Sequence, residues 1–298
     1  MKKLRFKFLR YLGLAKLFKL LFQRDKVTII LFHDIDVDIA EQSFAYLSKH
    51  YNIIDLDTYI EAHYRKDSSK IPKNAMIITF DDGHIGNYEI LPVIKKYNIP
   101  ITIFLTAGII NTNKHFWFST KVTDISELEL KAKSNKERLE FLKDKDFWQE
   151  KIFETPEALS KKQIEEMSQY VNMQSHTLYH PILPKCSDSD AKKEIVESKK
   201  ILEEEFNLNI NTLAYPNGDY SDRDIKIAKD AGYRCAITVD YGFNTLDSDI
   251  FKLKRVSVND TKDINELIVK ASGLWAFIKS RNGTKQAYGY AKSIKEYT

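Results

Sequence analysis

The order of strand-like and helix-like segments along the chain predicts an α/β fold, either a single β/α barrel or a large open sheet. About seven strand-like segments alternate with helix-like segments, and no internal repeat or low-complexity tract interrupts them. The chain has 298 residues, of which 43% are hydrophobic, enough for one large core. Because barrels of about 200 to 250 residues fold as single domains, a second full domain is not required.

The individual elements follow from local patterns. Strands are indicated by short runs of apolar and β-branched residues, and helices by apolar residues three and four positions apart. Met76–Phe80 is such an apolar run and predicts a strand that is buried on both faces. After Gly83 the spacing is helical, and Pro92 is either a kink or the first position of a shorter helix. The predicted elements, in chain order, are strand Val27–Phe32, helix Glu41–His50, strand Ile53–Ile54, helix Leu56–Tyr64, strand Met76–Phe80, the helix after Gly83, strand Ile99–Leu105, a helix opened by the capping box Ser160–Gln163, strand Val171–Gln174, a helix opened by Ser187–Asp190, strand Asn211–Tyr215, helix Ser221–Ala231, strand Tyr233–Val239 and strand Lys252–Val258.

Two segments depart from the alternation. Residues 109–155 are rich in Lys and Glu and predict a helical insertion over the strand ends, either a wall or lid of a substrate cleft or a solvated structural insert. Residues 1–26 interleave nine Lys or Arg with Leu and Phe and predict a basic amphipathic helix. The expected organisation is this helix, one β/α domain over 27–275 and a C-terminal tail over 276–298.

The N-terminal segment leaves two alternatives open. Lys16 and Lys19 interrupt its apolar run, whereas a secretory signal needs about 7 to 15 uninterrupted apolar residues and a spanning helix about 20. The segment either lies on an anionic membrane surface, with Phe and Leu inserted, or packs on the domain or frays as a tail. We therefore expect a cytoplasmic protein, with peripheral contact on the inner face of the membrane in the first alternative.

Charge and cysteine content narrow the partners and the compartment. Lys and Arg exceed Asp and Glu by four, a surplus too small to indicate nucleic-acid binding outside the N-terminal segment. Cys186 and Cys235 lie far apart in the sequence and form no Cys-x-x-Cys pattern. We interpret them as reduced thiols of a cytosolic protein.

Two acids stand where the Met76–Phe80 strand ends. In parallel sheets and barrels the loops after the strands hold ligands and metals, so Asp81 and Asp82 lie where chemistry is usually done. Their side chains point in different directions because they are sequence neighbours. One could hold a metal ion while the other takes a proton. Taken alone, the Asp82–Gly83 dipeptide is equally typical of a turn.

Two later stretches also follow predicted strands. His176 and His180 are four residues apart, a spacing that places both imidazoles on one side of a helical turn, where they could reach one ion. Two His and one carboxylate form a common open catalytic set, and Asp82 can supply the carboxylate. The turn Tyr215–Gly218, which includes Pro216 and Asn217, either presents a backbone N–H and an aromatic wall to a ligand or is a plain loop.

These stretches resemble the motifs of the polysaccharide deacetylase family, the carbohydrate esterases built on the NodB homology domain. Thr79–Gly83 resembles the first motif, Ser175–Pro181 the second and Tyr215–Gly218 the third, and the likeness spans roughly residues 27–258. The resemblance implies a distorted β/α barrel with a divalent metal, most often Zn²⁺, with Co²⁺, Ni²⁺ or Mn²⁺ as alternatives. It further implies that the metal ligands are Asp82, His176 and His180, that Asp81 is the catalytic base, and that the backbone N–H of Asn217 stabilises the oxyanion.

Two departures from the family pattern concern the catalytic groups. The third motif usually contains an arginine that orients the base, and the matching position here is Ala214. The late motif usually ends in a histidine that serves as general acid. The matching stretch here, Lys254–Val258, is not followed by a histidine, and the sequence has none after His180. Phe32–Ile35 resembles the start of family members in which the order of site elements is rearranged. His33 is thus the candidate acid, the alternative being that it only shapes the pocket.

The expected function is metal-dependent hydrolysis of an N-acetyl group, or alternatively an O-acetyl group, on a sugar. The substrate class is a polysaccharide or a glycan precursor, such as a lipid-linked or nucleotide-linked sugar used in surface polysaccharide biosynthesis. Two other functions remain open. The missing arginine and late histidine are compatible with a carbohydrate-binding protein whose site is degenerate, and the same machinery could remove a formyl group from a lipid-linked sugar.

Overall fold

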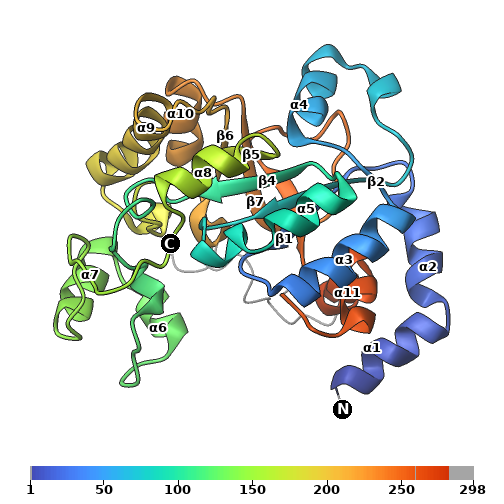
Figure 1. Cartoon of the computed structure of the whole chain (residues 1–298), viewed down its shortest axis with the longest axis horizontal. Coiled ribbons are helices and arrows are strands. Elements are labelled where there is room, and N and C mark those ends of the chain that lie inside the picture. Colours follow the sequence, from blue (N-terminus) through green and yellow to red (C-terminus); the bar gives the residue numbers. More distant parts are fainter. Residues whose placement is uncertain (1, 259, 282–298) are drawn as a thin grey trace.

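The computed structural model describes residues 2–258 and 260–281 as alternating strands and helices (Figure 1). The strands are β1 (Thr28–Phe32), β2 (Asn52–Ile53), β3 (Ala75–Phe80), β4 (Ile101–Leu105), β5 (Val171–Ser175), β6 (Thr212–Ala214), β7 (Cys235–Tyr241) and β8 (Leu253–Ser257). The α-helices are α1 (Lys2–Tyr11), α2 (Leu14–Phe18), α3 (Val37–His50), α4 (Leu56–Arg65), α5 (Leu91–Tyr97), α6 (Glu127–Ala132), α7 (Asn135–Lys143), α8 (Lys161–Met167), α9 (Asp188–Glu204), α10 (Asp222–Asp230), α11 (Ile264–Ala271) and α12 (Leu274–Arg281). A π-helical turn spans Lys19–Gln23, and short 3-10 helices span Ser68–Lys70, Ile85–Tyr88, Trp117–Ser119, Leu183–Lys185 and Pro216–Gly218.

The strands form a closed, all-parallel barrel. Their order is β1-β8-β7-β6-β5-β4-β3-β2, and an additional pairing of β1 with β3 closes the ring. Among the described residues β2 pairs only with the start of β3, so the ring has the seven other strands. The ring is uneven, because β1 pairs with β3 along its whole length whereas β5 and β6 share one pair, Ser175 with Leu213. The prediction of a distorted barrel of about seven strands is therefore confirmed, and the open sheet is excluded.

Side chains alternate between the inside and the outside of the barrel, as the pleat of a strand requires. In β3, Ala75 and Ile77 belong to the inner cluster, while Met76, Ile78 and Phe80 pack against the surrounding helices. Continuing this alternation past the end of the strand directs Asp81 inwards. The alternation of side chains that places apolar residues of β3 inside the barrel therefore also points Asp81 towards the barrel axis.

The two ends of the barrel differ. Helix α4 covers the end where the strands begin, since its Leu56, Tyr59 and Ile60 join the inner cluster and its Asp57 accepts hydrogen bonds from Asn172 and Asn211. Figure 1 shows α6 and α7 on the opposite side of the molecule from α4. The site loops, which follow the carboxyl ends of the strands, are thus at the end that α4 leaves uncovered.

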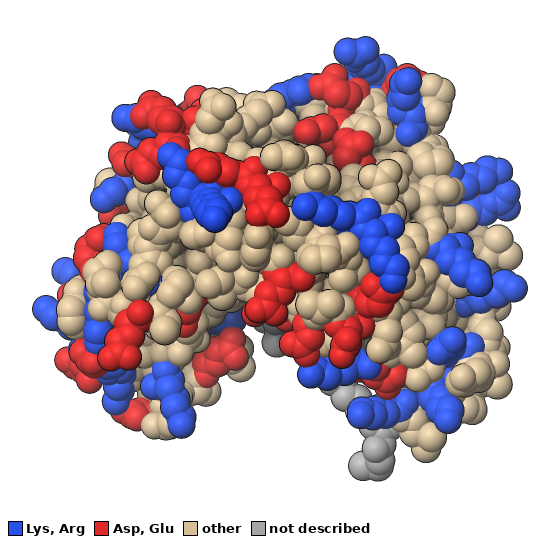
Figure 2. Space-filling view, viewed as in Figure 1, with Lys and Arg blue, Asp and Glu red and all other residues tan. Residues whose placement is uncertain are grey.

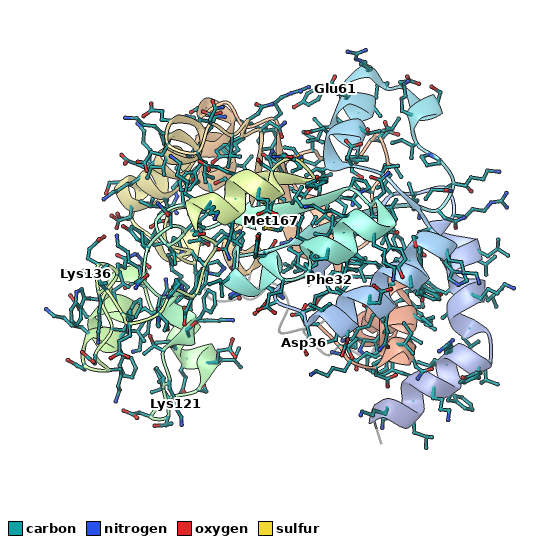
Figure 3. All side chains as sticks on the ribbon, in the orientation of Figure 1. Phe32, Asp36, Glu61, Lys121, Lys136 and Met167 are labelled. Carbon is teal, nitrogen blue, oxygen red and sulfur yellow. The ribbon has the colours of Figure 1, made fainter. Side chains whose placement is uncertain are left out.

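The surface is hollowed beside the insertion. Figure 2 shows an indentation between the lobe formed by α6 and α7 and the part of the molecule that contains α3. Asp36, which directly precedes α3, and Lys121, in the insertion, lie on its two sides (Figure 3). The insertion has a small apolar core of its own, made of Trp117, Leu130, Leu142 and Phe147.

Several predicted boundaries shift by a few residues. Helix α3 begins at Val37 rather than Glu41, and β2 is Asn52–Ile53 rather than Ile53–Ile54. Pro92 lies in the first turn of a shorter helix, α5, which confirms that alternative over a kink. The capping box at Ser160 forms as predicted. The predicted tail begins inside α12, and its remainder, 282–298, lies outside the described residues.

The single helix predicted over residues 1–26 is wrong in detail. Gly13 adopts a left-handed conformation (φ 73°) and separates α1 from α2. The segment packs one face on α11 and α12, with Phe6, Ala15 and Phe18 buried. Across residues 2–258 and 260–281, the helices are too short or too polar to span a bilayer.

Candidate metal and catalytic site

The turn after β3 holds Asp82 and Gly83 in an unusual backbone conformation. Asp82 and Gly83 both have positive φ angles, 76° and 75°. A Cβ at position 83 would lie 2.7 Å from Leu105 Cδ2, so only glycine fits there. Positive φ at a non-glycine residue such as Asp82 costs free energy and persists where the surroundings enforce it, which is typical of functional sites.

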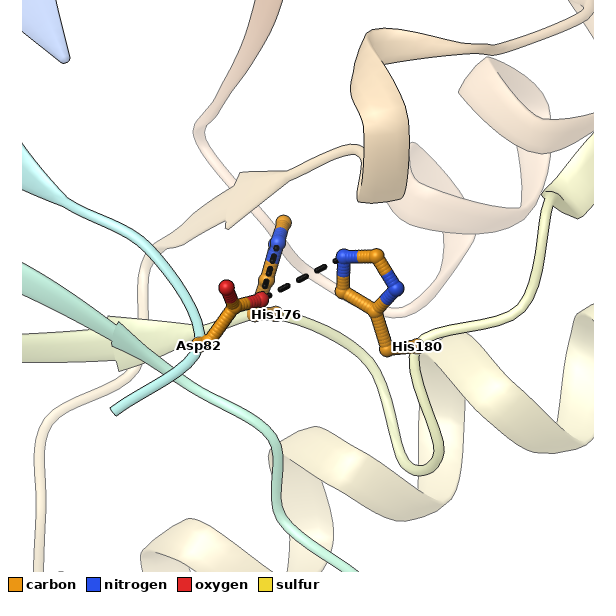
Figure 4. Close-up of side chains that lie close together, drawn as sticks. All are labelled: Asp82, His176 and His180. Atoms are coloured by element: carbon orange, nitrogen blue, oxygen red, sulfur yellow. Dashed lines mark ion pairs between the residues drawn. The ribbon is translucent and has the colours of Figure 1, made fainter. Parts of the chain in front are cut away.

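Asp82, His176 and His180 converge on one point. Asp82 Oδ1 lies 3.4 Å from His176 Nε2 and 3.3 Å from His180 Nε2. Figure 4 shows the carboxylate, at the end of β3, facing both imidazoles from the loop after β5. Taking one ligand atom from each residue, all three atoms lie within 4.8 Å of one another, and all three residues are buried.

The donor set fits a divalent cation. The backbone oxygen of Ala214 lies 2.8 Å from His176 Nδ1, so that nitrogen donates its proton, and in the neutral ring the lone pair is on Nε2, which faces Asp82. Burial lowers the pKa of His180 to about 3 despite the Asp82 carboxylate nearby, so the His180 ring is neutral. Asp82 Oδ1 is buried without a hydrogen-bond partner. Lone pairs of two imidazoles and one carboxylate that point at each other without an intervening proton need a positive charge between them.

The sequence predicted a helical turn for the His-x-x-x-His stretch, and this prediction is wrong. It is an irregular loop in which Thr177 and His180 have positive φ angles, 67° and 55°. Glu194 of α9 accepts hydrogen bonds from the backbone N–H groups of Leu178 and Tyr179, at 2.9 and 2.8 Å. Anchored backbone, rather than helical periodicity, therefore brings the two imidazoles together.

An arginine does contact the predicted base, which corrects the inference that the site lacks one. Arg255 of β8 forms a two-pronged ion pair with Asp81, Nη1 to Oδ1 and Nη2 to Oδ2, both at 2.7 Å. Its Nε donates to Thr238 O at 2.8 Å, and the side chain is buried. Burial alone would raise the pKa of Asp81, but the Arg255 charge holds it below its usual range. The carboxylate is thus ionised and fixed in orientation.

Sequence reasoning missed Arg255 although a signal was present. Leu253 belongs to the inner cluster, so the residue two positions later also faces the barrel interior. An arginine at an inward position needs an acidic partner, and Asp81 was the inward acid available. His84 was missed as well. Its Nε2 lies 3.1 Å from Asp82 Oδ2, which leaves Oδ1 to face His176 and His180.

His33 lies beside the acids at the edge where the barrel closes. Phe32 of β1 pairs with Phe80 of β3, and the Asp81 N–H donates to Phe32 O at 3.1 Å. His33 Nδ1 lies 3.3 Å from Asp260 Oδ2. Partial burial lowers the pKa of His33, but the hydrogen bond with Asp260 and the charges of Asp82 and Asp81 outweigh it and raise the pKa to about 9. A protonated imidazole therefore stands next to the cluster.

The turn after β6 brings its backbone to the site, but not its tyrosine ring. Tyr215 is fully buried and its hydroxyl donates to Phe251 O, so the expectation of an aromatic wall at this residue is wrong. The N–H groups of Tyr215, Gly218 and Asp219 bond backbone oxygens, and Pro216 has none. Asn217, at φ 57°, holds the remaining N–H of the turn.

The insertion contributes side chains to the same region. Phe118 packs edge-on against His180, with ring centroids 4.8 Å apart, and is 36% exposed. Trp117 Nε1 donates to His180 O at 2.7 Å. Lys131 Nζ donates to Asn217 Oδ1 at 2.9 Å. Of the two interpretations of residues 109–155, these contacts favour a wall of the site over a separate structural insert.

Comparison with known proteins agrees with this geometry. The sequence model of the family described as polysaccharide deacetylase matches residues 68–236, more than half of the chain. The chain belongs to this family. It is 25% identical over 243 residues to the putative polysaccharide deacetylase YxkH of Bacillus subtilis (strain 168), covering 78% of this chain and 72% of that protein. It is 29% identical over 216 residues to a poly-beta-1,6-N-acetyl-D-glucosamine N-deacetylase of Staphylococcus epidermidis, covering 69% of this chain and 61% of that protein.

Solved structures share the fold of this deacetylase. The deacetylase PplD of Streptococcus pyogenes, in complex with acetate, matches with a TM-score of 0.62 at 20% identity, over 83% of this chain and 98% of that one. IcaB from Ammonifex degensii matches with a TM-score of 0.62 at 18% identity, over 85% and 99%. The predicted family, barrel and enzyme class, a carbohydrate deacetylase, are thus confirmed, while the roles of single residues stay predictions.

Proposed function

We propose that this chain hydrolyses the N-acetyl group of an amino sugar in a saccharide made for the cell surface, with an O-acetyl sugar as the alternative. The observation that carries the proposal is the cluster of Asp82, His176 and His180 beside the Asp81–Arg255 ion pair. The printed function of the Staphylococcus epidermidis relative, a poly-beta-1,6-N-acetyl-D-glucosamine N-deacetylase, supports the N-acetyl assignment.

In this mechanism Asp81 is the general base. Its carboxylate is ionised by the Arg255 charge and held in one orientation by two hydrogen bonds. A water molecule placed between Asp81 and the substrate carbonyl would lose its proton to this carboxylate as it attacks the carbon. When a divalent cation is held by Asp82, His176 and His180, it supplies Lewis acidity, which polarises the carbonyl and lowers the pKa of water towards neutrality.

Two further groups would complete the reaction. The backbone N–H of Asn217 would donate to the oxygen that becomes negatively charged in the transition state, with Tyr215 and Pro216 fixing the turn. His33 would protonate the departing amine, because its raised pKa keeps the ring charged at neutral pH. Collapse of the tetrahedral intermediate then breaks the carbon–nitrogen bond, so acetate and the free amine leave.

We further propose Zn²⁺ as the ion, with Co²⁺, Ni²⁺ and Mn²⁺ as alternatives. Two imidazole nitrogens and one carboxylate oxygen form an open set that is typical of catalytic zinc. Metal analysis of purified protein, with and without chelator treatment, tests the identity of the ion. One equivalent of zinc that is absent from a His176→Ala variant supports this part of the proposal, and zinc retained by that variant argues against it.

The carrier of the sugar and the place of action complete the proposal. We place the chain on the cytoplasmic face of a membrane, where a lipid-linked or nucleotide-linked glycan precursor would be the substrate. The exposed basic and apolar N-terminal segment supports this location. Both cysteines are buried free thiols and are compatible with it.

A binding protein with an inactive site is the weaker alternative. It was favoured by the missing motif arginine and the missing late histidine. Arg255 removes the first reason because it contacts both carboxylate oxygens of Asp81, and His33 is our candidate for the role of the absent histidine. A deformylase for a lipid-linked sugar would use the same chemical steps and differs only in removing a smaller acyl group. Offering formylated and acetylated sugars side by side separates these two activities.

The test is a mass-shift screen for acyl loss from acetylated polysaccharides, lipid-linked saccharides and nucleotide sugars, with and without chelator. Asp81→Asn should bind metal normally and release acetate at least about 100-fold more slowly, since general base catalysis contributes 10²–10⁴-fold. Asp57→Asn, at the opposite end of the barrel, is the matched control and should keep its activity. Normal turnover by Asp81→Asn would refute the assignment of the base.

A further inference from the structure

The N-terminal segment has a docked face. Phe6, Ala15 and Phe18 are buried in one cluster with residues of α11 and α12. The Phe6 ring lies 4.7 Å from the Trp275 ring, and Arg10 Nη1 donates to Asn265 Oδ1 at 2.9 Å. These contacts hold α1 and α2 against the body of the protein, so the segment is not a frayed tail.

The remaining surface of the segment exposes apolar side chains, although one of them, Phe22, also stacks on Phe277. Nine of the eighteen exposed large hydrophobic side chains of residues 2–258 and 260–281 fall within this short segment, with exposed fractions from 37 to 71%. They are Leu4, Phe8, Tyr11, Leu12, Leu14, Leu17, Leu20, Leu21 and Phe22. Single exposed apolar side chains are ordinary, but a contiguous group of this kind marks a surface that binds something.

Basic residues surround these apolar side chains. Residues 1–26 contain nine Lys or Arg and a single acid, Asp25. Lys3, Arg5, Lys7 and Lys16 are exposed between the apolar positions. In Figure 2 the edge of the molecule that Figure 1 assigns to α1 and α2 carries blue side chains among tan ones. An apolar surface surrounded by positive charges favours a partner that has an apolar interior and a negatively charged surface.

We propose that residues 2–24 dock the protein on an anionic phospholipid bilayer. Leu, Phe and Tyr side chains enter the acyl region, while Lys and Arg remain at the phosphate groups. A second copy of the chain would also cover the apolar side chains, but it would bring two sets of unpaired cations face to face. This repulsion favours the bilayer over self-association.

The docked face gives the attachment a direction. Helix α11 packs against α1 on one side and against β8 and α3 on the other. Strand β8 carries Arg255, which contacts Asp81. The membrane-binding helices and the site are therefore connected through packed elements, and the bilayer would hold the barrel in a fixed orientation.

The test measures binding of the full chain to sedimented phosphatidylcholine vesicles with and without phosphatidylglycerol. The wild-type chain should bind the anionic vesicles. Its partition coefficient should fall about tenfold or more when added salt screens the Lys and Arg charges. A double variant, Leu20→Glu with Leu21→Glu, should lower the partition coefficient at least about tenfold, because each insertion buries an apolar side chain.

A matched double variant controls for added charge. Leu128→Glu with Ile152→Glu changes two side chains of the insertion that are 58 and 63% exposed, close to the 55 and 64% of Leu20 and Leu21. It should bind vesicles like the wild type, and both variants should melt at the wild-type temperature.

Binding that is absent, equal in both variants, or independent of phosphatidylglycerol would overturn the proposal. A dimer in light scattering that only the Leu20/Leu21 variant dissociates would overturn it in favour of a second copy. Acetate release from a soluble saccharide should be unchanged, so this test does not depend on the proposed activity.

Discussion

Replacing Arg255 by methionine tests the central electrostatic claim about the site. The guanidinium is buried and makes two 2.7 Å hydrogen bonds to Asp81. Methionine fills much of the same volume but leaves the carboxylate buried without a counter-charge. Removing one partner of a buried ion pair costs about 3–5 kcal/mol. At 1.36 kcal/mol per pKa unit, this predicts that the pKa of Asp81 rises by about 2–4 units.

The expected result is a displaced pH profile. As the base, Asp81 acts only when ionised, so activity is lost as the pH falls through its pKa. In the wild type this pKa lies below 3.8, and in Arg255→Met the acid limb of kcat/KM should move up by about 2–4 units. The ratio of activity at pH 5 to activity at pH 8 should therefore be lower in Arg255→Met than in the wild type, whose Asp81 stays ionised at both pH values.

The assay is acetate release followed from pH 4 to 9 with metal content measured in parallel. Arg138→Met is the matched control, because Arg138 is equally buried but packs over Trp117, away from Asp81. It should destabilise the fold without displacing the acid limb. An unchanged acid limb in Arg255→Met, or an equal displacement in Arg138→Met, would refute the role given to the Arg255–Asp81 pair.

Three further predictions concern other parts of the site. His84→Phe keeps the packing on Phe116 but cannot donate to Asp82, and competition with a chelator should show metal affinity lowered by about 10–100-fold; unchanged affinity would contradict the orienting role. Asp260→Asn removes the hydrogen bond that most raises the pKa of His33 above 6.5, so the basic limb of kcat/KM should move to lower pH, with activity lost at pH 8 but kept at pH 6. Leu142→Ala should cost about 2–5 kcal/mol within the core of the insertion, seen as faster limited proteolysis there, and unchanged cleavage would argue against that core.

The candidate metal cluster of Asp82, His176 and His180 could be predicted because each residue belongs to a contiguous stretch at the end of a strand. Asp82 follows an apolar run whose strand character is plain from the sequence. His176 and His180 were placed together for an incorrect reason, since a helical turn was expected and a loop with two positive φ angles was found. Spacing in the sequence limits how far apart two side chains can lie, but it does not specify the backbone path between them.

Arg255 could not be matched by motif because the partner of the base comes from a different strand than expected. The position that matches the arginine of the third motif is Ala214 on β6, whereas Arg255 lies on β8, which neighbours β1 and β7 rather than β6. Adjacency in a closed barrel depends on the strand order, and no local pattern states that order. The break at Gly13 was likewise hidden, because an amphipathic pattern continues across a residue that only tertiary packing turns to the left-handed conformation.

The closure of the barrel has a consequence for how small a working fragment can be. The family match covers residues 68–236, which includes Asp81, Asp82, His176 and His180 but neither β1 nor β8, and only the first two residues of β7. These two strands join the ring between β7 and β3. A polypeptide trimmed to the matched residues would retain Asp82, His176 and His180 yet present two unpaired strand edges, without the guanidinium on Asp81 and without His33. Such a fragment should aggregate rather than fold. A working enzyme therefore needs residues outside the range in which the family motifs are recognised.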